Sequence, residues 1–242
     1  MMLKAYKALR ESIKLGNFED YLELPNGILY SPVPKAANTT IKHLFLRYCD
    51  RLSEAELNQI AKDPQSIHQI LNLKYGVNRK RFIELAISGN YFCFSVLRNP
   101  VERFKSFYLD KILTSGWPCE MYGRVEIAYN LKASDSLEKV VNIACRTPDR
   151  LADIHFRSQH AILGSSTKIQ NHIRLYSISQ LHTLENDLKE HGLSDIPKLT
   201  FAKNSSSKKI MHTFNEDFRL YSKLIQRYKL DYSLLAKASE RR

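Results

Sequence analysis

Apolar positions and turn residues arrange the first half of the chain into two strand, loop and helix patterns. The first pattern occupies residues 27–48 and reads GILYSPVPKAANTTIKHLFLRY. Apolar residues between positions 28 and 33 predict a buried strand, Pro34 ends it, and apolar residues at helical spacing predict the helix that follows. These helical residues are Ile41, Leu44, Phe45 and Tyr48. The loop 35–40 therefore lies where a helix begins.

The second pattern begins at Tyr91 and reads YFCFSVLRNPVERFKSFYLDKIL. Its apolar run YFCFSVL predicts a buried strand, and the Asn-Pro pair that follows is typical of the N-cap and first turn of a helix. Arg98 is left at the carboxyl end of the strand. Ligands of open α/β sheets bind at the carboxyl ends of the strands, so we expect Arg98 and Lys35 to converge on one crevice. The alternative is that Arg98 only pairs with a local carboxylate such as Glu102.

The loop 35–40 carries one lysine among small and hydroxyl side chains. The first backbone N–H groups of a helix lack helical partners, and together with the helix dipole they attract an anion. The loop therefore predicts a site for a phosphate or a sulfate. The alternative is an ordinary connection in which Lys35 is solvated and the two threonines cap the helix. A nucleoside triphosphate P-loop is disfavoured, because the lysine precedes the small residues and no glycine lies between Gly27 and Gly76.

The remaining patterns predict a single domain with a short lead-in. Apolar and basic positions alternate at helical spacing from Leu3 to Leu15 and predict an amphipathic helix before the turn at residues 25–27. We therefore expect one domain over residues 1–242, with residues 1–24 as a helical N-terminal lead-in. Ser53 followed by Glu56 is typical of a capping box, which predicts another helix start.

Charge is the unusual feature of the composition. The chain has 37 Lys and Arg residues against 25 Asp and Glu residues, a formal net charge of +12, which favours an anionic partner. No apolar run approaches the roughly 20 residues that span a bilayer, and the N-terminus lacks the apolar core of a signal peptide. The four cysteines show no CxxC spacing, so we expect reduced thiols and no metal site.

The two loops together resemble those of a known enzyme family. The segment PKAANTT at residues 34–40 looks like the 5′-phosphosulfate loop of sulfotransferases that use 3′-phosphoadenosine 5′-phosphosulfate (PAPS), and RNPVERFKS at residues 98–106 looks like their 3′-phosphate motif. The most similar subgroup comprises carbohydrate sulfotransferases related to the HNK-1, chondroitin and uronyl 2-O-sulfating enzymes. DIHFRSQ at residues 153–159 is similar to the histidine segment of that subgroup, and YKLDY at residues 228–232 follows in the same order.

This resemblance implies an α/β fold with a P-loop-like, mostly parallel sheet flanked by helices on both faces. It implies a sulfotransferase that moves a sulfuryl group from PAPS to a hydroxyl of a carbohydrate or carbohydrate-bearing acceptor, without a metal. Lys35 and His155 would be catalytic, the lysine at the breaking bond and the histidine as general base. The implied donor-binding residues are Lys35, Ala36, Ala37, Asn38, Thr39, Thr40, Arg98, Ser106, Asn204, Ser205 and Lys208.

The sequence departs from the family pattern in places and leaves alternatives open. Ala37 stands where many relatives have glycine, and Asn99 replaces the commoner aspartate while keeping a capping side chain. His160 is a competing candidate for the base, with Glu102 and Asp110 as further ones. The anchor and disulfides of animal Golgi members are absent, so we expect a soluble, cytoplasmic, bacterial-type relative, or a lumenal protein whose anchor has been removed.

Two rival functions are also compatible with the sequence. A divergent nucleotide kinase would use the same loop with ATP and Mg²⁺. A basic nucleic-acid-binding module would explain the charge, but the aromatic residues fall in apolar stripes instead of alternating with basic residues, so no nucleic-acid partner is expected. The acceptor, which could itself be anionic, and the oligomeric state are not encoded in any motif.

Overall fold

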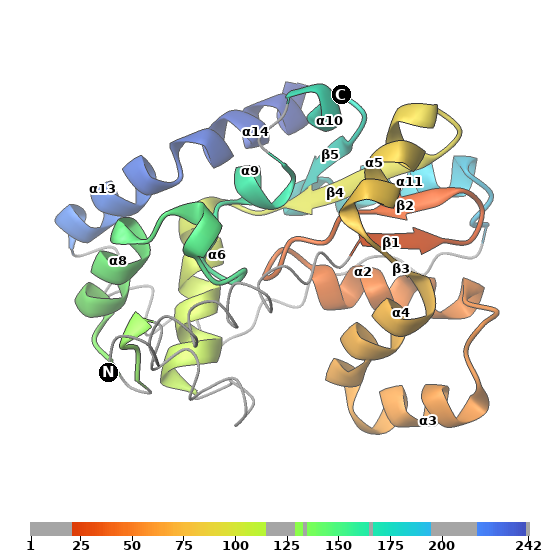
Figure 1. The fold of residues 1–242 in the computed structure, drawn as a ribbon, viewed down its shortest axis with the longest axis horizontal. Coiled ribbons are helices and arrows are strands. Elements are labelled where there is room, and N and C mark those ends of the chain that lie inside the picture. The colour runs from red at the N-terminus through yellow and green to blue at the C-terminus, as the bar shows by residue number, and fades with distance from the viewer. Residues whose placement is uncertain (1–20, 115–128, 133–134, 165–166, 195–216, 241–242) are drawn as a thin grey trace. The chain divides into compact units, whose positions relative to one another are not determined.

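The computed structural model describes residues 21–114, 129–132, 135–164, 167–194 and 217–240 (Figure 1). The chain divides into two units, which we describe separately. The sheet unit contains the described residues up to Arg98, those between Leu163 and 194, and those from Leu234 onward. The helical unit contains the described residues of 99–162 and 217–233.

The sheet unit is built on a five-stranded sheet of the described residues, with the strand order β3-β1-β2-β4-β5. The strands are β1 (Tyr21–Leu24), β2 (Ile28–Tyr30), β3 (Gly76–Val77), β4 (Phe92–Leu97) and β5 (Arg174–Ser177). The pairs β2–β4 and β4–β5 are parallel, whereas β1 is antiparallel to both β2 and β3. The predicted α/β class is confirmed, with a sheet that is mixed.

Strand β1 corrects the predicted lead-in, because residues 21–24 are extended and not helical. Leu24 pairs with Ile28 across the turn Pro25-Asn26-Gly27, in which Asn26 and Gly27 have φ of 60° and 66°. Asparagine and glycine tolerate this left-handed conformation, so the chain reverses directly into β2. Residues 1–20, including the predicted helix from Leu3 to Leu15, lie outside the described residues.

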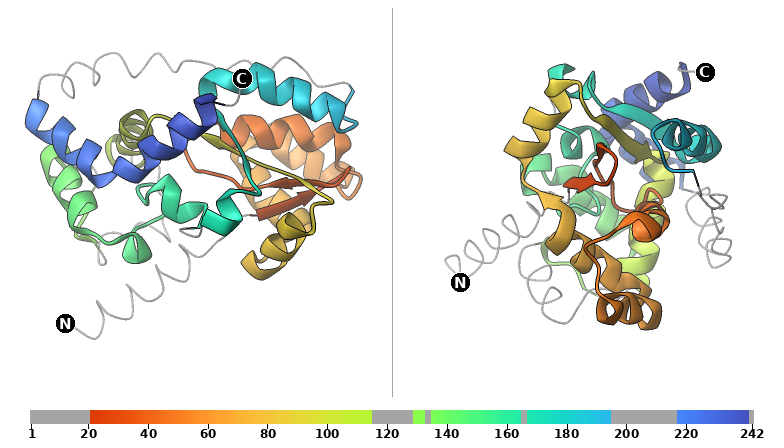
Figure 2. Two further views of the ribbon diagram at one scale, coloured as in Figure 1. Left: turned by 90° about the horizontal axis from the view of Figure 1, so that it is seen from above. Right: turned by 90° about the vertical axis from the view of Figure 1, so that its right-hand side faces the viewer.

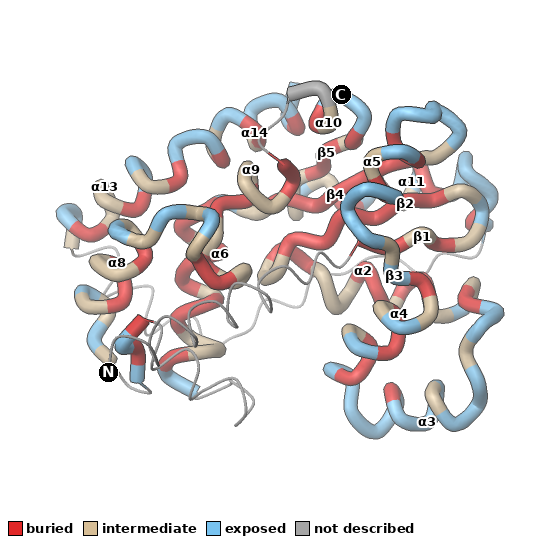
Figure 3. Tube along the Cα trace, in the orientation of Figure 1, coloured by how far each residue is buried: buried red, intermediate tan, exposed pale blue. Residues whose placement is uncertain are grey.

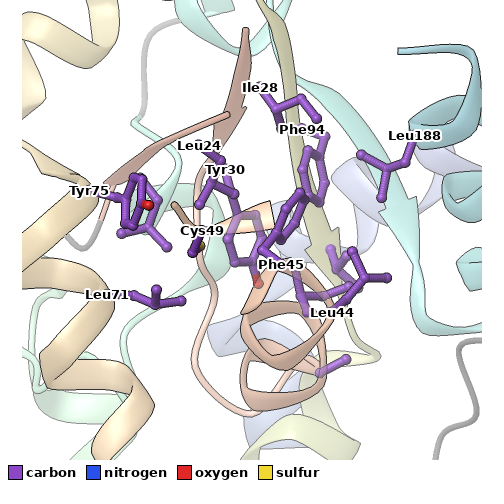
Figure 4. Packing of buried hydrophobic residues seen from close by; sticks show 14 of the residues in the cluster. Leu24, Ile28, Tyr30, Leu44, Phe45, Cys49, Leu71, Tyr75, Phe94 and Leu188 are labelled. Atoms are coloured by element: carbon purple, nitrogen blue, oxygen red, sulfur yellow. The ribbon is translucent and has the colours of Figure 1, made fainter. Parts of the chain in front are cut away.

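Successive side chains along the strands point to opposite faces of the sheet, and both faces are covered. Leu22, Ile28, Tyr30, Phe94 and Tyr176 share one face and belong to one buried cluster, which α2, α4 and α11 complete (Figure 4). The helices that follow the sheet residues in this unit have these bounds: α2 Asn38–Phe45, η1 Leu46–Tyr48, α3 Glu54–Lys62, η2 Pro64–Ser66, α4 Ile67–Tyr75, α5 Arg79–Ser88, α10 Thr167–Gln170, η5 Ile178–Gln180 and α11 Leu181–Glu190.

Helix α5 covers the opposite face. Tyr21 and Glu23 point away from the Leu22 side of β1, and the Tyr21 ring stacks on Phe82 of α5 at 4.2 Å. Figures 1 and 2 show α5 on the side of the sheet opposite α2. The predicted arrangement of helices on both faces is therefore present within this unit. Strand β2 is buried along its length, and β4 is buried from Cys93 to Leu97 (Figure 3).

The helical unit has its own apolar core. Its elements are α6 (Pro100–Phe107), the π-helical turn η3 (Tyr108–Leu113), α8 (Leu137–Arg146), η4 (Asp149–Leu151), α9 (Gln159–Ile162) and α13 (Phe218–Arg227). Val101, Phe104 and Phe107 of α6 pack with Phe156 and Tyr228 in this core. Helix α14 (Lys229–Glu240) starts in the helical unit and ends in the sheet unit. No helix of the described residues is long and apolar enough to cross a membrane.

Candidate anion-binding and proton-transfer sites

The loop between β2 and α2 has an unusual backbone. Lys35 and Ala37 both have positive φ, 66° and 59°. For residues with a side chain this conformation costs about 1–2 kcal/mol relative to the right-handed region. A glycine would adopt it freely, whereas the side chains of Lys35 and Ala37 make it costly. Backbone strain of this kind is characteristic of ligand-binding loops.

This loop leaves the start of α2 without a side-chain cap. The N-cap residue is Ala37, which carries no side-chain acceptor, and the first helical bond runs from the N–H of Ile41 to the carbonyl of Ala37 at 2.9 Å. The N–H of Ala36 is engaged in the preceding turn, where it donates to the Val33 carbonyl at 3.2 Å. Backbone donors at positions 38–40 therefore form the end of a helix dipole to which an anion can bind.

Arg98 lies against this loop. It directly follows β4, whose parallel neighbour β2 leads into the loop, so both carboxyl ends meet at one edge of the sheet. The Arg98 Nη1 donates to the Lys35 carbonyl at 3.2 Å. The structure thus joins the Arg98 side chain to the backbone of the loop that carries Lys35.

Helix α4 contributes two contacts that the sequence did not predict. The Nε2 of His68 lies 3.0 Å from the hydroxyl oxygen of Thr39. One turn further along α4, Asn72 accepts a hydrogen bond of 3.4 Å from the ammonium of Lys42, whose side chain is buried in α2. Thr39 therefore does not cap its own helix, and a partner from another helix holds its hydroxyl. No local sequence signal marks His68, because this contact spans 29 residues.

A hollow of about 370 Å³ lies elsewhere in the sheet unit. Its lining includes Gly27, Phe92 and Arg174, which stand at the amino ends of the parallel strands. Lys35 and Arg98 belong to the opposite edge of the sheet.

In the helical unit, α6 has the capped start that the sequence predicts. The Asn99 side chain accepts hydrogen bonds from the N–H groups of Val101 and Glu102 at 3.0 and 3.2 Å, and Pro100 occupies the first turn. The Glu102 carboxylate pairs with Lys105 at 2.8 Å. Ser106 is half-buried in the last turn of α6. Its role at the 3′-phosphate stays a prediction.

His155 is held by a buried carboxylate. The Asp153 Oδ1 lies 2.7 Å from His155 Nδ1 and also accepts the backbone N–H of His155 at 2.9 Å. Burial by itself would raise the pKa of Asp153, but the charge and hydrogen bonds of His155 outweigh burial, so the pKa lies below its usual value. An ionised Asp153 favours a proton on Nδ1, which places the lone pair of the imidazole ring on Nε2.

Two buried side chains fix the backbone around His155. Arg103 donates to the carbonyls of Ile154 and Arg157 at 2.8 and 2.7 Å. Tyr228 donates to the Phe156 carbonyl at 2.7 Å. Buried polar groups are costly unless they are paired, so this network specifies one conformation for the segment.

Asp231 completes this arrangement at the start of α9. Its carboxylate accepts the N–H groups of Gln159 and His160 at 3.0 and 2.8 Å. Burial raises the pKa of Asp231 despite these two hydrogen bonds. The YKLDY motif thus braces the DIHFRSQ segment through Tyr228 and Asp231. The sequence placed the two motifs in order without predicting this contact.

The late loop carries the remaining predicted donor-binding residues. Asn204, Ser205 and Lys208 lie outside the described residues, and their roles stay predictions. Among the described residues, no group of three His, Cys, Asp or Glu side chains could hold a metal ion.

A sheet edge with an uncapped helix start and a flanking arginine is typical of α/β proteins that bind anionic ligands. The family model described as "Sulfotransferase family" matches residues 23–238. The chain therefore belongs to the sulfotransferase family and is a sulfuryl transferase. No curated protein and no solved structure matches the chain.

Proposed function

We propose that this protein transfers the sulfuryl group of PAPS to a hydroxyl of a carbohydrate or carbohydrate-bearing acceptor. One observation carries the proposal of this donor: Arg98 is bonded to the carbonyl of Lys35, beside the helix end that lacks a side-chain cap. PAPS carries one anionic group at the 5′ position and another at the 3′ position. A loop that carries one cation, with a second cation bonded to its backbone, suits a ligand with two anionic groups.

The loop would bind the phosphosulfate. Backbone donors at positions 38–40 and the Thr39 and Thr40 hydroxyls bind its oxygens, while Lys35 neutralises the bridging oxygen as the sulfur–oxygen bond breaks. Ala36 and Ala37 keep the loop small enough for a close approach. Arg98 and Ser106 bind the 3′-phosphate, which sets this donor apart from ATP.

The acceptor hydroxyl needs a base, and His155 is our candidate. Its Nε2 takes the hydroxyl proton while the oxygen attacks sulfur, the bridging bond breaks, and adenosine 3′,5′-bisphosphate leaves. Asp153 stabilises the imidazolium that forms, because it already contacts Nδ1 at 2.7 Å. The similarity of DIHFRSQ to the carbohydrate subgroup and the net charge of +12 support a saccharide acceptor, including an anionic one.

Calorimetry with adenosine 3′,5′-bisphosphate tests the donor site. We expect wild-type protein to bind it and Arg98→Ala to lose affinity by about 30-fold or more, since a hydrogen bond to a charged group contributes about 1.5–3 kcal/mol. Arg174→Ala, at the amino end of a strand of the same sheet, is the matched control and should keep its affinity. Binding of Mg²⁺-ATP without the bisphosphate would favour the kinase instead, and steeply salt-dependent binding of duplex DNA would favour the nucleic-acid module.

Turnover with labelled PAPS tests the base and the acceptor class. A panel of sugars, glycolipids and small alcohols identifies the acceptor, and His155→Ala should reduce kcat about 10²–10⁴-fold with unchanged bisphosphate affinity. His160→Ala is the control on the same segment. Loss of turnover in the His160 variant but not in the His155 variant would transfer the role of base to His160.

A further inference from the structure

Helix α4 reaches the anion-binding loop through a short polar seam within the sheet unit. His68 and Asn72 lie four residues apart on α4, and they contact Thr39 and Lys42, which lie three residues apart on α2. Residues at these spacings share one face of a helix, so the two polar faces meet. The contact at His68 is the one that involves a donor-binding residue.

The direction of this hydrogen bond decides what Thr39 can offer to a ligand. If the hydroxyl donates to a lone pair on His68 Nε2, the Thr39 oxygen presents only lone pairs to its other neighbours, and these repel an anion. If His68 carries the proton on Nε2 and donates it to the Thr39 oxygen, the hydroxyl proton is available for the anion. An anion that contacts the Thr39 hydroxyl therefore requires the second arrangement.

We propose that His68 is a positioning residue of the donor site, which donates its Nε2 proton to Thr39 and thereby points the Thr39 hydroxyl at the 5′-phosphate end of the donor. This inference rests on the proposed function, because it assigns a role within the same loop. His68 acts through Thr39 and does not take part in the proton transfer from the acceptor.

Substitutions at His68 that differ in hydrogen-bonding capacity test the proposal. The amide nitrogen of His68→Gln can occupy the place of Nε2 and always donates, so bisphosphate affinity should stay within about twofold of wild type. His68→Ala removes the partner and should weaken affinity about five- to tenfold. His68→Glu can only accept when ionised and should weaken it by about 30-fold or more.

Two controls separate this role from charge and from general stability. Gln69→Glu adds the same charge at an exposed neighbouring position of α4 and should change affinity less than about threefold. Adenosine 3′-monophosphate lacks the 5′-phosphate, so His68→Ala should bind it as wild type does, which also shows that the variant is folded. Arg98→Ala should weaken binding of both nucleotides.

A double-mutant cycle localises the effect. In a Thr39→Val background the difference between His68→Ala and His68→Gln should disappear, because no hydroxyl remains to be oriented. Equal affinities of these two variants in the wild-type background, or a difference that persists with Thr39→Val, would overturn the role of His68. Failure of wild-type protein to bind the bisphosphate would instead overturn the proposed function, and this inference with it.

Discussion

The two parallel strands β2 and β4 lead into helices whose first turns are built in opposite ways. Helix α6 begins with a capping Asn99 and a proline, so two of its first N–H groups are bonded to a side chain and one is absent. Helix α2 begins at Ala37, which has a positive φ and no side-chain acceptor. The second start is energetically poorer as isolated structure.

The two helix starts differ in what they offer to an anion. The open end at α2 offers backbone donors, whereas the closed end at α6 cannot. The residue before the closed end, Arg98, instead reaches the neighbouring loop and bonds to the carbonyl of Lys35. The N-terminus of α2, which would bind the ligand, is the less stable helix start, and the capped N-terminus of α6 is the more stable one.

A carboxylate placed at the uncapped N-terminus of α2 should have the largest effect on bisphosphate affinity. Ala37→Asp places a carboxylate at the N-terminus of α2, where it competes with the anion for the same donors and repels it. We expect bisphosphate affinity to fall about 100-fold or more, measured by calorimetry. Asn99→Asp adds the same charge at the capped end and keeps the cap, so its affinity should stay within about threefold of wild type. Equal losses in both variants would contradict the assignment of the anion to α2.

A smaller effect on affinity is expected when the planar guanidinium of Arg98 is replaced by another positively charged group. Arg98→Lys retains a cation but cannot bond to the Lys35 carbonyl and a phosphate with one planar group. We expect bisphosphate affinity about tenfold below wild type, between wild type and Arg98→Ala. An affinity equal to that of wild type would mean that only the charge matters, and that the bond to the loop has no role in binding.

The smallest effect on affinity is expected when the side-chain cap of α6 is removed. Asn99→Ala removes the cap of α6 and should lower the free energy of unfolding by about 1 kcal/mol, measured by urea denaturation. Bisphosphate affinity should change less than twofold, because the donors of α6 do not face the ligand in our proposal. A tenfold loss of affinity without loss of stability would show that the ligand also contacts the first turn of α6.

Local sequence patterns predicted the strands and caps next to these helix starts. The strand ending before Arg98, the cap at Asn99 and the capping box of Ser53 with Glu56 are all confirmed. Strand β1 was missed, although the Asn-Gly turn before β2 is a hairpin signal. The brace from Asp231 to α9 was not predictable in this way, because its partners lie 71 and 72 residues away.

The sequence by itself determined the α/β class, the order of the two loops and the residues that carry charge in them. These features follow from short-range periodicity and from turn and cap residues, which act over a few positions. Tertiary structure decided that Arg98 bonds to the Lys35 carbonyl, that His68 contacts Thr39, and that buried groups fix the segment of His155. Such contacts depend on strand register and helix packing between distant segments, and no local pattern encodes them.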